Sequence, residues 1–355
     1  MAQQAVDQDK LNKLFGRVMS DVGGALGLLL GYIGDQLGLY RALADGGSMT
    51  SEQLAAATGL HERSVREWLA ANATAHYVKY ESGSETFSLS PEQAVVFAGE
   101  GNPQCAQGFF QNIMSLFIDE PKVTEAFRTG KGVPWSDRHP CLFCGTERFF
   151  RPHYAMSVAK KWIPALEGVK ERLDAGGRVA DIGCGHGSST IVMAKAFPNS
   201  TFYGFDFHGP SIEHARERAK EAGVEGNTVF EVQTAEDFQG DGFDLVTVFD
   251  ALHDMGDPIG AAAHVCKALS DGGVFMVVEP FSGDSLEENM TLLGRLSYAA
   301  SAMVCTQASL AQDVGLALGS QAGQKRLTEV LNEAGFSHVR RAAETQANIV
   351  LEARA

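Results

Sequence analysis

The chain has 355 residues, and its 29 basic and 44 acidic residues give a net charge of −15. This length exceeds what one ordinary core spans, so it indicates two domains, and a composition with 45% apolar and 21% charged residues excludes disorder throughout. Because the net charge is strongly negative, binding to nucleic acid or to an anionic membrane would require a local basic patch. A neutral or cationic small ligand would meet no such repulsion.

The first residues, MAQQAVDQDKLNK, lack the basic start and apolar stretch of a secretory signal. The most apolar run, residues 22–33, contains four glycines and is too short to span a bilayer, so we expect a packed or partner-facing helix there. Six cysteines spread over so long a chain do not indicate a disulfide framework. We therefore expect free thiols and a reducing compartment such as the cytoplasm. Cys141 and Cys144 form a single C-x-x-C without a second pair, so we expect no bound metal.

The N-terminal half, residues 1–150, shows helical periodicity interrupted by one short hairpin pattern. Together these elements predict a mostly helical winged helix-turn-helix domain. The expected helices are Asp35–Ala44, a helix from Thr50 or Ser51 to Gly59, and Ser64–Ala75, and the expected strands of the wing are Tyr77–Tyr80 and Thr86–Leu89.

The winged-helix pattern suggests DNA binding, but its charge argues against that function. Between Leu37 and Glu100 there are four basic and eight acidic residues. A helix that enters a DNA groove needs cations for the phosphates, whereas the third helix pairs Arg63 and Arg66 with acidic and apolar neighbours. We therefore expect this domain to pack against protein and expect no nucleic-acid partner.

From residue 151 to the C-terminus, short apolar strands alternate with helices. This order predicts an α/β domain with a Rossmann-like, doubly wound parallel sheet whose ligand lies at the carboxyl ends of the strands. A helical insertion at about 283–320 interrupts the alternation, and strands at 338–342 and 349–352 would close the sheet as an antiparallel hairpin. The expected parallel strands are RVADIG, TFYGFD, TVFEVQ, FDLVTVFD and GVFMVVEP.

The first of these strands leads into Asp181-Ile182-Gly183-Cys184-Gly185-His186-Gly187, a loop with three alternating glycines that precedes a helix. Glycines permit the turn and let a ligand approach the backbone closely. A nicotinamide enzyme would instead show G-x-G-x-x-G or G-x-G-x-x-A, and neither Gly183 nor Gly185 begins such a pattern.

The D-x-G-x-G-x-G arrangement resembles motif I of class I S-adenosylmethionine (SAM) dependent methyltransferases. The resemblance to this family covers residues 177–355. In that family Asp181 would orient the loop and the amino group of the cofactor, with Gly183 and Gly185 beneath it, and an acid at the end of the second strand, here Asp206, would accept the ribose hydroxyls. Capping of the next helix is the alternative for Asp206. The resemblance also assigns three groups of cofactor contacts: Phe207 beside the adenine, Ala235 and Glu236 in the loop at its edge, and Phe249 and Asp250 on the methionine side.

The fourth strand runs into Asp250-Ala251-Leu252-His253-Asp254-Met255, which resembles the HDW-x-D segment of plant-type small-molecule O-methyltransferases, with Met255 in place of Trp. The resemblance makes His253 the general base, and an imidazole can take an acceptor proton near neutral pH. The alternative is a histidine that caps the next helix or packs beside the cofactor.

Apolar residues of both halves are candidates for the walls of an acceptor pocket, although each of them could equally belong to an ordinary core. Glu279, at the end of the fifth strand, is expected to face the same cavity. The candidate walls are Phe110, Met114, Phe149, Tyr154, Met290 and Tyr298.

A winged helix joined to a class I domain resembles bacterial winged-helix-containing SAM methyltransferases, in which the winged helix mediates dimerisation. The resemblance implies a cytoplasmic homodimer that moves a methyl group from SAM to a small, aromatic or apolar acceptor, with oxygen as the first choice, sulfur or nitrogen as alternatives, and S-adenosylhomocysteine (SAH) as product. A SAM-binding regulator without turnover is the alternative from another class, and an NAD-dependent oxidoreductase is disfavoured by the glycine spacing.

Overall fold

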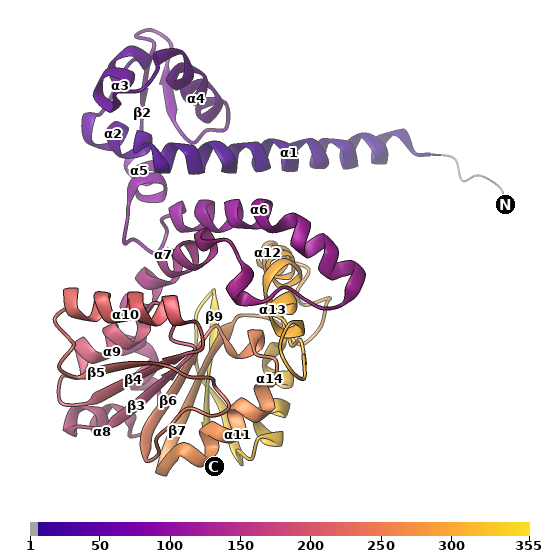
Figure 1. Ribbon diagram of the computed structural model, residues 1–355. Helices are drawn as coiled ribbons and strands as arrows, with labels where there is room; N and C mark the ends of the chain where they lie inside the picture. Colours follow the sequence, from indigo (N-terminus) through magenta and orange to yellow (C-terminus); the bar gives the residue numbers. More distant parts are fainter. Residues whose placement is uncertain (1–5) are drawn as a thin grey trace. The chain divides into compact units, whose positions relative to one another are not determined.

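The computed structural model describes residues 6–355, which form two compact units (Figure 1). The first unit contains the described residues up to Ser115 together with Cys141–Phe149, and the second contains Leu116–Pro140 and Phe150–Ala355. The chain crosses between the units three times. Residues 116–140 pack with the second unit, although they precede residue 150, where the sequence predicted the domain boundary.

The first unit contains the winged helix-turn-helix that the sequence predicts. Its two short strands pair antiparallel, with Tyr80 opposite Phe87. Thr50 caps the second helix of the motif through the backbone N–H of Gln53, and Gly59 ends that helix in the left-handed conformation. The elements are α1 (Gln8–Gln36), α2 (Leu39–Gly46), α3 (Ser51–Thr58), α4 (Glu62–Thr74), β1 (Lys79–Glu81), β2 (Thr86–Ser88) and α5 (Pro91–Ala98), followed by α6 (Gln107–Thr129) and α7 (Pro140–Ser157), which each cross between the units.

The single helix predicted over residues 35–44 is wrong, because the structure has two helices there. Helix α1 ends at Gln36, and α2 begins at Leu39 after Gly38, whose φ of 68° breaks the helix. The apolar periodicity continues across this break since Tyr40 and Leu43 of α2 enter the same core as the last turns of α1.

The end of α1 is fastened to α4 within the first unit. The indole of Trp68 donates a hydrogen bond to the carbonyl of Leu30 at 2.9 Å. A Cβ atom at Gly34 would lie 2.5 Å from the Trp68 ring, so only glycine permits this close approach. The buried hydroxyl of Tyr40 also donates to the side chain of Asn72 at 2.7 Å.

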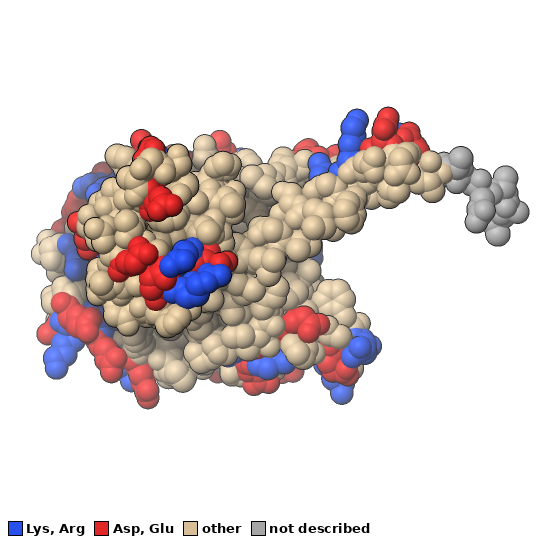
Figure 2. Space-filling model, turned by 90° about the horizontal axis from the view of Figure 1, so that it is seen from above, with Lys and Arg blue, Asp and Glu red and all other residues tan. Residues whose placement is uncertain are grey.

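Most of α1 lies outside this core. It is the one helix of residues 6–355 that is long and apolar enough, by length and composition, to cross a membrane, which is weak evidence by itself. The expectation that the apolar run was too short is therefore wrong, because the helix extends far beyond residues 22–33. Figure 2 shows charged atoms along one edge of this helix near its start and uncharged surface over the rest of the visible face. Its exposed apolar side chains are Leu11, Leu14, Phe15, Val18, Met19, Val22, Leu26 and Ile33.

The second unit is built on a seven-stranded sheet with the order β5-β4-β3-β6-β7-β9-β8. Strands β5, β4, β3, β6 and β7 are parallel, and β9 and β8 are antiparallel, as the sequence predicts. Because β3 lies between β4 and β6, the strand order reverses beside β3, and a crevice opens at the carboxyl ends there. The strands are β3 (Arg178–Ile182), β4 (Thr201–Asp206), β5 (Thr228–Val232), β6 (Phe243–Phe249), β7 (Leu269–Pro280), β8 (His338–Glu344) and β9 (Asn348–Arg354).

Helices cover both faces of this sheet (Figure 1). Successive residues of β3 alternate between two buried clusters, with Val179 in the cluster beneath α8, α9 and α10, and Ala180 in the cluster beneath α11 and α14. The alternation buries both faces, which is typical of a parallel sheet. The helices are α8 (Val169–Ala175), α9 (Ser188–Ala196), α10 (Gly209–Glu221), α11 (Pro258–Ala268) and α14 (Gly323–Glu333).

The expected helical insertion is present between β7 and α14. Ser309 fastens it to the domain, because its hydroxyl donates to the carbonyl of Met255 at 2.7 Å. The insertion leaves Met290, Leu292 and Leu296 exposed. It consists of α12 (Leu292–Ala300), η5 (Ser301–Cys305) and α13 (Thr306–Leu310), and the remaining short elements of the unit are η1 (Trp135–Asp137), η2 (Val158–Trp162), η3 (Ile163–Ala165) and η4 (Leu252–Asp254).

Candidate active site

The glycine loop lies between β3 and α9, at the carboxyl ends of the strands. Gly183, Gly185 and Gly187 all have positive φ, with values of 68°, 52° and 74°. A Cβ atom at Gly187 would lie 2.9 Å from the Phe230 ring, whereas one at Gly185 would meet nothing within 4 Å. Gly187 therefore permits close packing, and Gly185 presents bare backbone to open space, where a ligand can approach it.

Asp181 anchors this loop from below. Its buried carboxylate accepts hydrogen bonds from the hydroxyls of Ser189 and Thr190 at 2.6 Å each, and from the hydroxyl of Thr247 at 3.0 Å. Burial raises the pKa of Asp181, the three hydroxyls lower it, and the result is about 6. The structure thus places Asp181 as a clamp between β3, α9 and β6, in the loop-orienting position that the resemblance assigned to it.

Asp206 ends β4 and lies beside the same loop. Its carboxylate accepts the backbone N–H of Gly185 at 2.9 Å and that of His208 at 2.8 Å. Each carboxylate oxygen can accept a further hydrogen bond, so both remain available to ligand hydroxyls. Burial raises the pKa of Asp206, and the two backbone donors lower it. The next residue, Phe207, has an exposed ring, as an adenine-contacting side chain requires.

The loop after β5 holds the two residues expected at the adenine edge. Ala235 is partly buried against the sheet core, and Glu236 is exposed. The loop is fixed by a hydrogen bond of 2.6 Å from the hydroxyl of Thr234 to Asp237, and by the ring of Phe238, which is buried in the core.

Phe249 and Asp250 follow at the end of β6. The ring of Phe249 packs into the core, with its centroid 5.2 Å from that of Tyr154, so its side chain belongs to the scaffold of the site. Asp250 has a φ of 49°, which is uncommon for a residue other than glycine. Its carboxyl group accepts from the amide of Asn348 at 2.6 Å and from the hydroxyl of Tyr154 at 3.3 Å. Burial and then the nearby charge of Glu279 raise the pKa of Asp250 to about 8.

His253 lies on η4, directly after this strand, and is buried. Its Nδ1 forms a short hydrogen bond with Glu279, whose other oxygen accepts the backbone N–H of Leu252 at 3.0 Å. Both carboxylate oxygens of Glu279 are therefore engaged beneath the ring. Glu279 was expected to face the acceptor, and the structure places it as the group that orients His253.

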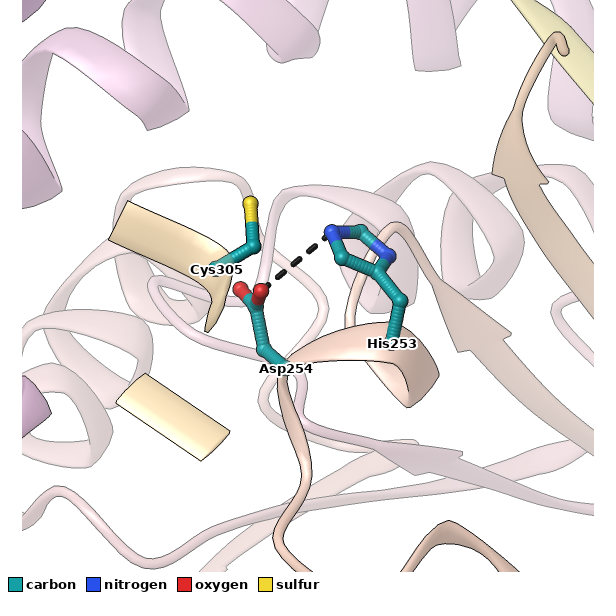
Figure 3. A group of neighbouring side chains, drawn as sticks. All are labelled: His253, Asp254 and Cys305. Carbon is teal, nitrogen blue, oxygen red and sulfur yellow. Dashed lines mark ion pairs between the residues drawn. The ribbon is translucent and has the colours of Figure 1, made fainter. Parts of the chain in front are cut away.

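The second ring nitrogen of His253 faces Asp254 and Cys305 (Figure 3). Its Nε2 lies 3.3 Å from Oδ1 of Asp254. Burial lowers the pKa of His253, but the charges of Glu279 and then Asp254 outweigh burial and leave it well above its usual value. Two carboxylates thus flank the ring, one beside each nitrogen, and both favour its charged form.

The same three side chains could in principle hold a metal ion, since their ligand atoms lie within 4.8 Å of one another. Histidine, cysteine and aspartate are all zinc ligands. The imidazole, however, already makes an ion pair on one nitrogen and a hydrogen bond on the other, so neither of its nitrogens is free to bind a metal. Among residues 6–355 this is the one such group, and it does not include Cys141 or Cys144.

The candidate wall residues are divided between the two units. In the first unit, Phe110 is buried in the core, and Phe149 packs against Phe109 with ring centroids 4.1 Å apart. Met114 belongs to the same unit and is partly buried. In the second unit Tyr154 contacts Asp250, as described above, whereas Met290 and Tyr298 lie exposed on the helical insertion.

Sequence reasoning missed Arg138, Asn348 and Cys305. Arg138 and Asn348 are both at most 3% exposed, and they come from segments far from the motifs. Cys305 resembles any thiol in an apolar helix. The one available signal was Asp254, because it directly follows His253 and would have indicated a second carboxylate beside the ring.

Comparisons with known proteins match both parts of the chain. Residues 173–335 match the family described as a methyltransferase domain, and residues 24–98 match the Rv2258c-like winged HTH domain. The chain therefore carries a methyltransferase domain of the class I SAM-dependent fold behind a winged helix-turn-helix domain.

Curated relatives match only in part. The 27-O-demethylrifamycin SV methyltransferase of Amycolatopsis mediterranei (strain S699) is 34% identical over 103 residues, which cover 28% of this chain and 38% of that protein. The chain spans between 38% and 47% of the length of the first four curated relatives that it matches.

Solved structures resemble the whole chain. Mitomycin 7-O-methyltransferase has a TM-score of 0.73 at 18% identity, with 98% of this chain and 100% of that chain covered. Human N-acetylserotonin methyltransferase, solved in complex with SAM, has a TM-score of 0.72 at 16% identity, with 99% of both chains covered. At these identities the likeness shows the fold.

The ion pair between His253 and Glu279 predicts how the pKa of His253 changes when Glu279 is replaced. In Glu279→Gln the carboxylate charge beside Nδ1 is lost, so the pKa of His253 should fall. An NMR titration of the imidazole nitrogens measures this change. Asp257→Asn, which alters the cap of α11, is the control and should leave the titration unchanged. An equal pKa in Glu279→Gln and the unmodified protein would contradict the assignment.

Proposed function

We propose that this protein transfers a methyl group from SAM to a small acceptor molecule, with oxygen as the attacking atom. The observation that carries the proposal is the contact between Asp206 and the backbone of Gly185 at the crevice beside β3. It joins an acid that can bind a sugar to a loop whose glycine faces open space, inside a domain that matches methyltransferases.

The residues of the crevice fit this cofactor. The bare backbone of Gly183 and Gly185 would lie beneath it, Asp206 would accept the ribose hydroxyls, and Phe207 would contact the adenine, with Ala235 and Glu236 near its edge. Asp250, whose raised pKa favours the neutral carboxyl group, would face the methionine end without adding a full negative charge. The cofactor supplies an activated methyl group, so the protein mainly aligns the acceptor and excludes water.

His253 is the residue that we propose as the general base. Glu279 holds Nδ1, so Nε2 is the atom that would take the proton of the acceptor hydroxyl. Nε2 faces Asp254 in the described structure, and an acceptor must therefore insert beside this carboxylate. Since Glu279 stabilises the charged ring, the proton would be held at His253 once the methyl group has moved.

The names of the relatives support oxygen as the attacking atom and small molecules as acceptors. The rifamycin, mitomycin and N-acetylserotonin enzymes named above all act on small molecules, and two of them are described as O-methyltransferases or by an O-demethyl substrate. A SAM-binding regulator without turnover remains the second candidate because of the winged helix, whose acidic composition disfavours DNA.

We also propose that the protein is a cytoplasmic homodimer. The cysteines of the described residues are all free thiols, which fits a reducing compartment. The exposed apolar face of α1 is larger than a soluble monomer usually leaves uncovered, and a second copy would bury it.

The dimer proposal can be tested on α1. Replacing Leu14 and Val18 together by glutamate would place charges in the interface and should convert a dimer into a monomer. Light scattering coupled to gel filtration measures the mass. Lys13→Glu, on the same helix, is the control for added negative charge and should leave the dimer intact. A monomeric unmodified protein would refute the proposal.

The cofactor assignment predicts binding of SAH and not of NAD in isothermal titration calorimetry. Asp206→Asn should weaken SAH binding by about 10- to 100-fold, because a neutral amide replaces a charged acceptor. Asp241→Asn, an exposed residue further along the same connection, is the matched control and should bind SAH normally. Tight binding of NAD without any binding of SAH would end the proposal.

The base assignment predicts that His253→Ala lowers turnover by about 10²- to 10⁴-fold while SAH affinity stays unchanged. The measurement is a transfer assay with labelled SAM on an acceptor found by screening phenols, thiols, amines and carboxylates. His338→Ala, an exposed residue on β8, is the control. If turnover is unchanged in His253→Ala, the ring only supports packing.

A further inference from the structure

Arg138 is a buried cation whose hydrogen-bonding capacity is only partly used. The residue is 3% exposed, and its Nη2 donates to the carbonyl of Met303 at 2.8 Å. Its Nε and Nη1 atoms are buried and find no hydrogen-bond partner in the described structure. Unsatisfied donors on a buried charge are costly, so a native protein that retains them has a reason to do so.

The segment that carries Arg138 is firmly held. The backbone N–H of Val133 donates to the carbonyl of Gln307 at 2.9 Å, and that of His139 donates to Asp119 at 2.9 Å. Among the acids, Asp119 has the largest effect on the pKa of Arg138, but its oxygens are engaged by this N–H and by Lys122 at 2.8 Å. The free donors of Arg138 are therefore fixed in place and are not neutralised by a hydrogen bond from Asp119.

These donors lie next to the His253 group. Met303, the one hydrogen-bond acceptor of Arg138, is two residues before Cys305, whose thiol lies within 4.8 Å of the ligand atoms of His253 and Asp254. Burial lowers the pKa of Arg138, and the charges of Asp119, Cys305 and Asp254 oppose this. Burial raises the pKa of Asp254, and the charge of Arg138 in turn lowers it.

Asp254 has a buried acceptor atom without a hydrogen-bond donor. Its Oδ1 is buried and accepts no hydrogen bond, although it lies 3.3 Å from Nε2 of His253. One side of the site thus offers unused donors on a cation, and the other offers an unused acceptor beside the proposed base. A ligand with an anionic oxygen and a hydroxyl group would satisfy both.

We propose that Arg138 binds a carboxylate of the methyl acceptor, which is a hydroxy-carboxylic acid whose hydroxyl lies at His253 and Asp254. This inference rests on the proposed function and specifies its substrate class. Arg138 is then a specificity-determining residue, and the hydroxyl oxygen is the atom that receives the methyl group while its proton passes to His253.

The charges of the site favour a carboxylate over a phosphate. A general base must be neutral before it takes a proton, so with His253 neutral Arg138 and the sulfonium of SAM balance Asp254 and Glu279. A single carboxylate then adds one negative charge, which lies beside Arg138. A phosphate dianion would instead add excess negative charge beside two buried carboxylates, which the low dielectric of the interior penalises.

The test uses the full-length protein saturated with SAH. Calorimetry compares 2-, 3- and 4-hydroxybenzoate with their methyl esters, which keep the ring and the hydroxyl but lack the anion. We expect at least one acid to bind tenfold or more tightly than its ester. In Arg138→Gln this preference should disappear through weaker binding of the acid, with the ester changed less than threefold, and Arg138→Lys should retain part of it.

Lys131→Gln is the matched control, because it removes an exposed positive charge from the same segment while leaving Arg138, Lys122 and Asp119 in place, and it should keep the preference for the acid. A thermal unfolding scan supplies a second readout. Since the donors of Arg138 are unsatisfied without ligand, Arg138→Gln should unfold at the same or a higher temperature. A structural arginine would instead show a clear loss of stability.

Several results would overturn the inference: no acid preferred over its ester in the unmodified protein, a preference that survives in Arg138→Gln, or a strongly destabilised Arg138→Gln. Transfer from labelled SAM then identifies the methylated atom. A methyl ether on the bound acid supports the inference, and a methyl ester, which would place the carboxylate at the methyl group, overturns it. Failure of SAH to bind at all refutes the proposed function instead, so the two failures are distinguishable.

Discussion

The candidate site depends on the buried carboxylate of Asp181. Three hydroxyls, two from the first turn of α9 and one from β6, donate to this group and tie the glycine loop to the centre of the sheet. The loop in turn reaches Asp206 through the N–H of Gly185. Without this clamp, backbone at left-handed φ angles would have no fixed position, and the crevice beside β3 would lose its shape.

A second constraint is the balance of buried charge around His253. Glu279 and Asp254 flank the ring, and Arg138 lies close to Asp254. Buried charges persist only when they are paired or when a ligand will complete them. Glu279 is fully engaged, whereas Arg138 and Asp254 retain buried atoms without a hydrogen-bond partner in the described structure, and our proposal for the acceptor rests on this difference.

Much of the fold could be predicted, because its signals are local. The parallel strands are continuous apolar runs, and the wing is a short hairpin around a turn. The motif from Asp181 to Gly187 predicts a loop between a strand and a helix. The helix break at Gly38 was missed since the apolar period continues through it. The roles of Glu279 and Arg138 were also missed, because each depends on which distant backbone or ring atom lies beside it.

The sequence by itself determined the architecture of the second unit and pointed to the loop from Asp181 to Gly187 as the place for a cofactor, since strand order, glycine spacing and a terminal acid are properties of contiguous residues. Only the tertiary structure decided that Glu279 supports His253 instead of facing an acceptor, that Phe249 packs into the core, and that Arg138 is buried with free donors. The physical reason is that burial and hydrogen-bond satisfaction are fixed by residues far apart in the chain, which no local pattern records.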